Sequence, residues 1–427
     1  MGVAKLDPTS ASKQRTCGVA LGITDMAAIG IRGEWMFLSC GTKLIATHVK
    51  QDRKPFVFDC STAKKREHEP KADEDGSLAG APGSDMILAF AISPSGKLAA
   101  LTDDSKRLVL FECQQCWQCV STRWLARRGT SLAFTGAEDE VLVADKSGDV
   151  YSFSVIQPDR EGELKMGHLS MVLALTMSLD GKYIITADRD EKIRVSHLCS
   201  PYNIQSFCLG HKEFVSSLLV PSGELPWLLS GSGDGTIKLW EYETGQRLQS
   251  WDLKALEETS VEKSDDERVT VCRITGSPDG CHVAVQCDGV SSVQFFALNR
   301  DDNGKKLAPR SRVALPRRPL DATFDPEGRL WVLMDSDETP LQICTLEQSA
   351  WKCDAASPEL QRATAAFLPH WETVDGSAKA ARRFEHLHKA AFDNVAAYME
   401  KKQQRLQEKQ KTKTEHKDNR KKARKVL

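Results

Sequence analysis

The chain has no long hydrophobic run, and this absence excludes a helical membrane protein. A membrane-spanning helix needs about twenty consecutive apolar residues, and no stretch of the 427 residues approaches that length. The first ten residues, MGVAKLDPTS, are too polar for a secretory signal peptide. Leu6 stands where the N-myristoylation pattern requires serine or threonine. We therefore expect no membrane among the partners of this protein.

The motifs of common catalytic sites are also missing. The sequence contains no GxSxG, no HExxH, no Walker loop and no glycine-rich loop of the kind that holds S-adenosylmethionine. Such glycine loops belong to alternating βα units, and a βα pattern does not occur here. We expect a protein that is not itself an enzyme and that holds no cofactor.

The thirteen cysteines give no even disulfide framework. Most lie in apolar, strand-like runs, so we expect reduced core thiols of an intracellular protein. Cys113, Cys116 and Cys119 (CQQCWQC) have a spacing that could chelate zinc, but no fourth ligand follows nearby. The sequence predicts no metal site.

What the sequence does contain is a repeated unit, seen most clearly in residues 210–251. This stretch opens with Gly-His and holds four short strand-like segments, FVSSLLV, WLLSGS, TIKLWEY and LQSW, separated by turns rich in Gly, Asp and Ser. Four short strands in about forty residues are typical of one β-propeller blade, here of the WD-repeat type. Side chains at the positions of the WD hydrogen-bonded tetrad are His211, Asp234 and Trp240, with Ser230 or Ser232.

The unit recurs with a regular period. Turn aspartates that precede a β-branched strand are Asp104, Asp149, Asp190, Asp234 and Asp288, and their separations are 45, 41, 44 and 54 residues. WD-type blades repeat every 40–45 residues or so. Blades are expected at 34–60, 86–113, 130–156, 168–199, 211–251, 268–298 and 320–346. The predicted fold is an all-β, seven-bladed propeller over residues 17–356, in which residues 17–23 complete the last blade and close the ring.

The segments outside the blades differ in composition. Residues 1–16 are expected to be flexible, 63–85 a disordered loop, 255–267 an acidic loop and 357–379 a linker. Residues 380–410 contain no Gly or Pro and carry an apolar stripe at helical spacing, which predicts an amphipathic helix. A basic, disordered tail is expected over 411–427. Residues 401–427 hold twelve Lys or Arg against three Asp or Glu.

Charged residues of both signs surround the turns of neighbouring blades. The stretch TADRDEKIR (186–194) carries far more charge than a WD turn needs, and the turn ADKSGD (144–149) lies one blade earlier. Neighbouring blades can present such turns side by side, so we expect one partner-binding patch. Its predicted residues are Lys146, Asp188, Arg189, Glu191, Lys192, Arg194 and Lys212.

Several of these stretches resemble one known family. VLVADKSGDVYSFSV (141–155), ITADRDEKIRVS (185–196), FCLGHKEFVS (207–216) and KAAFDNVAAYMEKKQQRL (389–406) are similar to the WD-repeat subunit of the tRNA (guanine-N(7)-)-methyltransferase. LTDDSKRLVLF (101–111) and GHLSM (167–171) match the same family, so the resemblance covers about residues 88–406. Blade four departs from the general WD pattern, because Ser196 stands in place of the tetrad tryptophan.

The resemblance implies a non-catalytic scaffold that forms a heterodimer with the catalytic methyltransferase subunit. That partner holds S-adenosylmethionine, and the complex forms 7-methylguanosine in the variable loop of tRNAs, in the nucleus. We expect Phe392 and Tyr398, on the apolar stripe, to dock on the propeller or the partner. Docking would deliver Lys401, Lys402, Arg405 and Lys409 to the tRNA backbone. Two alternatives stay open at this point: a WD-repeat substrate adaptor of a ubiquitin ligase that needs no RNA, and a hydrolase or transferase acting alone.

Overall fold

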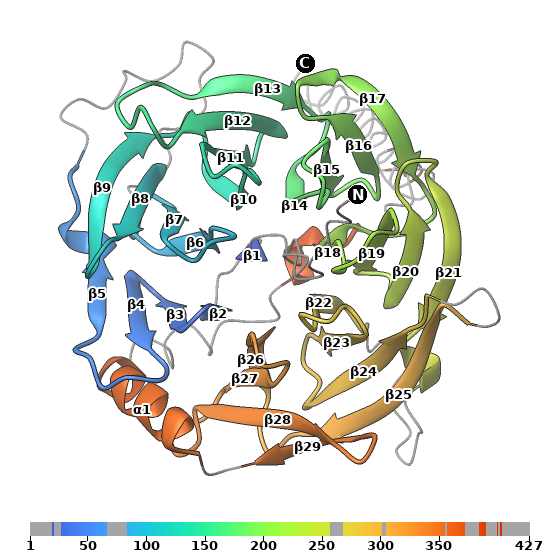
Figure 1. Ribbon diagram of the computed structural model, residues 1–427. Helices are drawn as coiled ribbons and strands as arrows, with labels where there is room; N and C mark the ends of the chain where they lie inside the picture. The colour runs from blue at the N-terminus through green and yellow to red at the C-terminus, as the bar shows by residue number, and fades with distance from the viewer. Residues whose placement is uncertain are drawn as a thin grey trace, which may run out of the picture. The chain divides into compact units, whose positions relative to one another are not determined.

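Seven antiparallel sheets surround a central axis in the computed structural model (Figure 1). The structure describes residues 19–20, 27–65, 83–256, 268–300, 305–354, 357–371, 384–389, 399 and 402–403. Each sheet forms one blade, so the prediction of an all-β, seven-bladed propeller is confirmed. Within the described residues, no helix is long and apolar enough to cross a membrane.

Each blade runs from an inner strand at the axis to an outer strand at the rim. Blade one holds β2 (Ala28–Arg32), β3 (Trp35–Cys40), β4 (Lys43–His48) and β5 (Phe56–Asp59); blade two holds β6 (Ile87–Ile92), β7 (Leu98–Asp103), β8 (Arg107–Cys113) and β9 (Trp117–Trp124). Blade three holds β10 (Gly129–Phe134), β11 (Glu140–Asp145), β12 (Asp149–Ser154) and β13 (Glu163–Gly167); blade four holds β14 (Val172–Met177), β15 (Tyr183–Asp188), β16 (Ile193–His197) and β17 (Ser200–Cys208).

The remaining three blades repeat the same order. Blade five holds β18 (Val215–Leu219), β19 (Trp227–Ser232), β20 (Thr236–Glu241) and β21 (Gln246–Asp252); blade six holds β22 (Val271–Gly276), β23 (His282–Cys287), β24 (Ser292–Leu298) and β25 (Leu307–Ala314). Blade seven holds β26 (Pro319–Phe324), β27 (Leu330–Met334), β28 (Leu341–Glu347) and β29 (Ala350–Asp354). Short 3-10 helices are η1 (Cys60–Thr62), η2 (Lys254–Leu256), η3 (Leu368–His370) and η4 (Glu385–Leu387).

The inner strands are largely buried because both of their faces pack on neighbouring blades, and β6, β10, β14 and β26 are buried along their whole length. In β6 (ILAFAI) and β14 (VLALTM) every residue is buried. Such continuous apolar runs are expected where a strand has no solvent face. The core is therefore a ring of apolar clusters between successive blades, and the outer strands carry the solvent-facing side chains.

The predicted tetrad of blade five is present. Trp240 Nε1 donates to Ser230 Oγ at 2.8 Å, His211 Nε2 lies 2.7 Å from the same oxygen, and His211 Nδ1 lies 3.1 Å from Asp234 Oδ2. Burial lowers the pKa of His211. The neutral imidazole therefore donates to Asp234 and accepts from the Ser230 hydroxyl, which satisfies every buried polar group in the chain of bonds.

The prediction that residues 17–23 complete the last blade is wrong. The strand β1 (Val19–Ala20) pairs with β6, so it extends blade two, and blade seven takes all four of its strands from the C-terminal part of the ring. Among the residues that the structure describes, no strand is shared between blades seven and one. They are joined instead by side chains: the Ile29 amide donates to Asp321 Oδ2 at 2.9 Å.

The prediction of a linker over 357–379 is wrong in its first part, because residues 358–367 form the helix α1 (Pro358–Phe367), and residues 372–379 lie outside the described residues. Ser357 caps this helix by accepting from the Leu360 amide, and proline occupies its first turn. Leu360 and Phe367 join the apolar cluster of blades one and seven, and the Arg362 guanidinium donates to the Val49 carbonyl. The helix thus covers the junction at which the ring closes (Figure 1).

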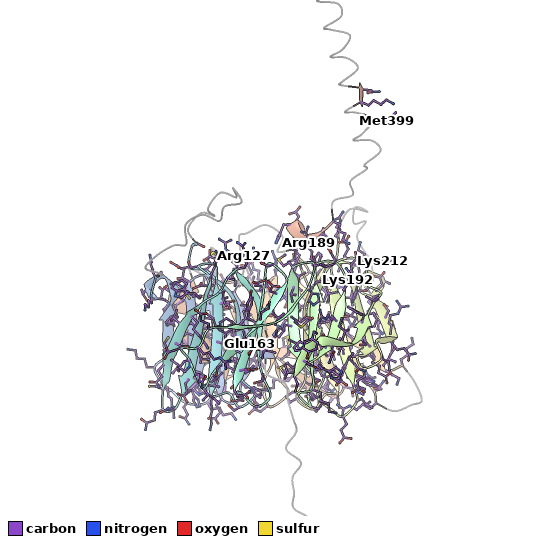
Figure 2. All side chains as sticks on the ribbon, turned by 90° about the horizontal axis from the view of Figure 1, so that it is seen from above. Arg127, Glu163, Arg189, Lys192, Lys212 and Met399 are labelled. Carbon is purple, nitrogen blue, oxygen red and sulfur yellow. A yellow bond between two sulfur atoms is a disulfide. The ribbon has the colours of Figure 1, made fainter. Side chains whose placement is uncertain are left out.

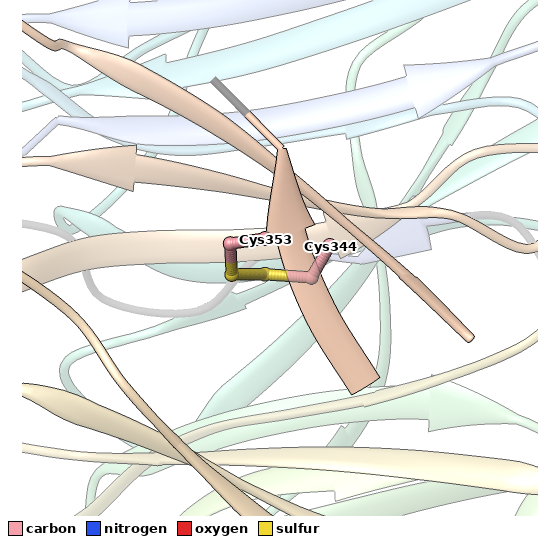
Figure 3. The surroundings of a disulfide bond; sticks show 2 residues. All are labelled: Cys344 and Cys353. Atoms are coloured by element: carbon pink, nitrogen blue, oxygen red, sulfur yellow. A yellow bond between two sulfur atoms is a disulfide. The ribbon is translucent and has the colours of Figure 1, made fainter. Parts of the chain in front are cut away.

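The expectation of reduced thiols fails for one pair of cysteines. Cys344 and Cys353 are cross-strand neighbours on β28 and β29, and they form a disulfide (Figure 3). The other ten cysteines in the described part of the chain are free. No group of three or more potential metal ligands occurs among the described residues.

The two loops and the C-terminal helix are only partly described. Residues 66–82 and 257–267 lie outside the described residues. The end of the first loop is not disordered as predicted, since Asp85 forms an ion pair with the buried Arg107. Of the predicted helix over 380–410, the structure describes residues 384–389, which include η4, and three helical residues at 399, 402 and 403. The predictions for residues 1–16 and 411–427 also fall outside.

Candidate functional site

One face of the propeller carries the turns between the second and third strands of each blade, together with the connections to the next blade. We call it the turn face. Figure 2 shows Arg189, Lys192 and Lys212 along this face, on blade four and at the entry to blade five. Lys146 occupies the equivalent turn of blade three, between β11 and β12. The fold therefore brings the predicted charged turns to neighbouring positions on one face.

The predicted residues divide into exposed groups and internal braces. Lys146, Lys192 and Lys212 are exposed, whereas Arg189 and Glu191 are half-buried. Glu191 has a φ of 72°, in the left-handed region that a tight turn requires of it. The three lysines can reach a partner directly.

Asp188 is buried and holds its turn together. Its carboxylate accepts from the Lys192 amide at 3.0 Å, and His168 Nδ1 lies 3.0 Å from its other oxygen. His168 Nε2 in turn contacts the Thr186 hydroxyl at 2.8 Å. Blade four therefore has an aspartate–histidine–threonine brace of its own, although Ser196 replaces the tryptophan.

Arg194 binds the backbone of two neighbouring blades. Its guanidinium donates to the Gly167 carbonyl on β13, to the Pro201 carbonyl on β17 and to the Ser196 hydroxyl, at 3.1, 2.7 and 2.9 Å. Burial lowers its pKa. Arg194 thus joins the outer strands of blades three and four and fixes the base of the charged turn.

Arg189 reaches toward the axis. Its Nε donates to the Leu387 carbonyl at 3.4 Å. Leu387 and Phe384 are buried with Leu173 and Phe214, at the inner ends of blades four and five. The C-terminal segment 384–387 is therefore seated on the turn face, beside the predicted patch.

The rim of blade four also exposes apolar side chains that sequence reasoning missed. Tyr202, Ile204 and Phe207 lie on the outer strand β17, and Leu209 follows it; their exposed fractions are 78, 43, 42 and 61 %. We call these four residues the apolar strip. A bulge between the partners of Val195 and Ser196 places Phe207 opposite Arg194 and Ile204 opposite Ser196. Apolar side chains therefore stand directly beside the charged turn.

The remaining predicted site residues are largely untested. Phe392, Tyr398, Lys401, Arg405 and Lys409 lie outside the described residues. Lys402 is described, and it is helical and exposed.

An axial cavity of about 440 Å³ opens on the opposite face. The charged groups at its wall are engaged within the fold: Arg273 pairs with Asp321, and Asp325 accepts from Arg329 and from the Trp331 indole. The Arg273–Asp321 pair joins blades six and seven, whereas the bonds of Asp325 hold the turn between β26 and β27 within blade seven.

Comparisons with known proteins agree with this geometry. The sequence model of the family described as tRNA methyltransferase TRM82 WD40 domain matches residues 43–165 and 157–361. The tRNA (guanine-N(7)-)-methyltransferase non-catalytic subunit wdr4 of Danio rerio is 54% identical over 89% of this chain and 92% of its own length. The corresponding subunit WDR4 of Homo sapiens is 42% identical over 87% of this chain and 89% of its own.

Solved structures support the fold alone. The crystal structure of RRP9 WD40 repeats matches with a TM-score of 0.57 and 19% identity, over 74% of this chain and 87% of that one. The structure of U3-55K matches with a TM-score of 0.56 and 20% identity, over 74% and 88%.

The propeller, with an apolar and charged edge on blades three to five, defines a WD-repeat scaffold of the kind that binds other proteins. The chain belongs to the family of WD-repeat non-catalytic subunits of tRNA (guanine-N(7)-)-methyltransferase. Its relatives give no support to a ubiquitin-ligase adaptor or to an enzyme acting alone.

Proposed function

We propose that this chain binds the catalytic methyltransferase subunit through the edge formed by the apolar strip and the charged turns, and helps to place tRNA on that subunit. The observation that carries the proposal is the position of the apolar strip beside Lys192 and Lys212. The partner binds S-adenosylmethionine, whose methyl group passes to N7 of a guanine in the tRNA variable loop. This chain supplies no group to that transfer.

The edge has the composition of a protein interface. Contiguous exposed apolar side chains mark interaction sites on soluble proteins. Aromatic residues such as Tyr202 and Phe207 are favoured at the centre of an interface, with charged residues at its rim. The lysines of the turns would then orient the partner, while the strip supplies most of the affinity.

Roles within the edge follow from burial. Lys146, Lys192 and Lys212 are placed to contact the partner, and Arg189 and Glu191 support the turn surface between them. Asp188 and Arg194 hold the turn and strand on which those contacts depend. Contact of Phe392 and Tyr398 with the propeller or the partner stays a prediction.

Activity of the reconstituted complex is the primary test. The chain co-expressed with the catalytic subunit should form a heterodimer that methylates tRNA at guanine N7. The chain alone should show no turnover and no S-adenosylmethionine binding by calorimetry at micromolar concentration. The matched controls are the catalytic subunit alone and that subunit mixed with an unrelated WD propeller. Methylation by this chain alone, or its micromolar binding of S-adenosylmethionine, would contradict the proposal.

The second expected result concerns the basic C-terminal residues. We propose that Lys401, Lys402, Arg405 and Lys409 contact the tRNA backbone, so deletion of 401–427 should weaken tRNA binding by the complex and flatten its salt dependence. Each lost phosphate contact lowers the salt slope by roughly 0.7–0.9. The measurement is tRNA affinity between low and physiological salt.

A control tests whether the position of the basic residues in the tail matters, or only their charge. Substituting those four residues by glutamine should weaken binding more than substituting Lys417, Arg420, Lys421 and Lys422, because the first group follows segment 384–387 more closely in the sequence. Equal effects of the two sets would mean that the tail attracts RNA without a defined place. No effect of either set would leave the tail as an import signal only, in line with the nuclear location that we also propose.

A further inference from the structure

The outer side of blade six carries a run of positive charge. Between residues 305 and 318 there are six basic residues and no acidic one. The residues of this basic strip are Lys305, Lys306, Arg310, Arg312, Arg317 and Arg318. We propose that the basic strip is a second binding surface for the phosphate backbone of tRNA, separate from the C-terminal tail.

The strip crosses the whole thickness of the propeller. Lys305 and Lys306 precede β25, Arg310 and Arg312 lie on it, and Arg317 follows it on the connection to blade seven. Eight extended residues span about 27 Å, at 3.4 Å for each residue. The charge therefore runs from the face opposite the turn face up to the turn face itself.

The side chains of the strip are presented to solvent. Lys305, Arg310, Arg312 and Arg317 are exposed. Arg310 and Arg317 form no ion pair with an acidic side chain of the described residues. The ammonium groups of both lysines lie over aromatic rings: Lys305 Nζ is 4.9 Å from the centre of the Trp251 ring, and Lys306 Nζ is 5.1 Å from that of Trp227. These cation–π contacts position the two charges without neutralising them. Arg318 is bound to the carboxylate of Asp288 at 2.8 Å, and Arg312 Nε donates to the Ser292 hydroxyl at 2.8 Å.

Protection of a sheet edge does not account for this pattern. The outer strands of other blades carry mixed charges, a single charge or none: β13 has Glu163 and Lys165, β21 has Arg247 and Asp252, and β17 has no charged residue. Isolated or mixed charges are enough to prevent edge-to-edge pairing. Two charges of one sign on β25, extended by four more beside it, instead indicate a ligand of the opposite sign.

The chemistry of the strip favours a nucleic acid backbone over an acidic protein segment. Four of the six residues are arginines, whose planar guanidinium can donate two parallel hydrogen bonds to two oxygens of one phosphate. Pro309 in the middle of β25 removes a backbone donor, which disfavours the addition of a peptide strand at this edge. An extended chain of phosphates, as in a nucleic acid backbone, fits both features.

The basic strip also lies apart from the proposed partner-binding edge. Blade five lies between blade six and the edge on blade four (Figure 1), so β25 is two blades away from the apolar strip. The inference rests on the proposed function, since it assumes that the complex binds tRNA. It assigns to the propeller a contact that was expected of the tail alone.

The test compares two triple variants in the full heterodimer. Lys305→Gln, Arg310→Gln and Arg317→Gln together should raise the Kd for tRNA roughly tenfold at physiological salt and lower the salt slope by about 2–3. The control is Lys54→Gln, Lys97→Gln and Arg160→Gln, three exposed cations on blades one, two and three. This control variant makes the same charge change and should leave the Kd for tRNA and the salt slope near those of the unsubstituted complex. Co-elution with the catalytic subunit should be unchanged in both variants.

The outcomes separate the two proposals. Equal affinities and salt slopes for the two triple variants would overturn the role of the strip, and would point to an acidic protein segment as its ligand. Failure of the unsubstituted heterodimer to bind tRNA would overturn the proposed function instead. Loss of binding in the blade-six variant alone supports the strip.

Discussion

Substitution of Ile204 by aspartate should abolish assembly with the catalytic subunit, raising the Kd at least a hundredfold. Ile204 is 43 % exposed in the centre of the apolar strip, and it faces Ser196 across the strand pair. A partner that covers this side chain would have to remove the new carboxylate from water in an otherwise apolar contact, which costs several kcal/mol. Each 1.4 kcal/mol is tenfold in Kd, at about 25 °C. Calorimetry and co-elution measure the loss.

The chain offers a matched control for this substitution. Leu346, near the end of β28 on blade seven, is 42 % exposed and also aliphatic. Leu346→Asp makes the same chemical change at the same exposure, away from blade four, and should leave assembly intact. If Ile204→Asp assembled as well as Leu346→Asp, the apolar strip would not be the partner-binding edge.

The blades could be predicted from sequence because their signals are local and repeated. The turn aspartates and the short apolar strands recur with one period, and each strand pairs with the next along the chain. The tetrad of His211, Ser230, Asp234 and Trp240 follows from the same pattern. Pairing between strands that follow each other in the sequence can be predicted without knowing which distant residues come into contact.

Closure of the ring could not be predicted in the same way. The strand β1 has two residues, and two residues carry no side-chain pattern that distinguishes blade two from blade seven. The helix α1 did have a signal: Ser357 before Pro358, then Leu360, Ala363 and Phe367 at helical spacing. The end of the β pattern near residue 356 favoured a linker instead.

The disulfide and the apolar strip could not be predicted because both depend on the register of paired strands. The disulfide between Cys344 and Cys353 exists because β28 and β29 place the two cysteines opposite each other, which only the turn between them decides. The apolar strip depends on the bulge in β17, which turns Ile204 and Phe207 to the same side of the strand pair. A one-residue shift would have reversed either arrangement.

Replacement of Phe367 by alanine should destabilise the closed ring by about 3–5 kcal/mol, the usual cost of removing a fully buried aromatic side chain. Phe367 is wholly buried at the end of α1, in the cluster that includes Ile29 of blade one and Trp331 of blade seven. Blades one and seven share no strand in the described part of the chain, so this cluster and the bond from the Ile29 amide carry the closure. Urea unfolding gives the loss of stability, and hydrogen exchange locates it.

The pattern of hydrogen exchange decides whether α1 acts as a clasp, that is, as an element that specifically holds blades one and seven together, or only as part of the core. A clasp that fails should speed exchange first in β2 and β26, which flank the junction, while β14 and β18 across the ring stay protected. The neighbouring Leu368, 44 % exposed, provides the control, and Leu368→Ala should change neither stability nor exchange appreciably. Uniformly faster exchange in all seven blades of Phe367→Ala would show that the ring opens as one cooperative unit. In that case the junction of blades seven and one would be no weaker than the others, and α1 would not be needed as a separate clasp.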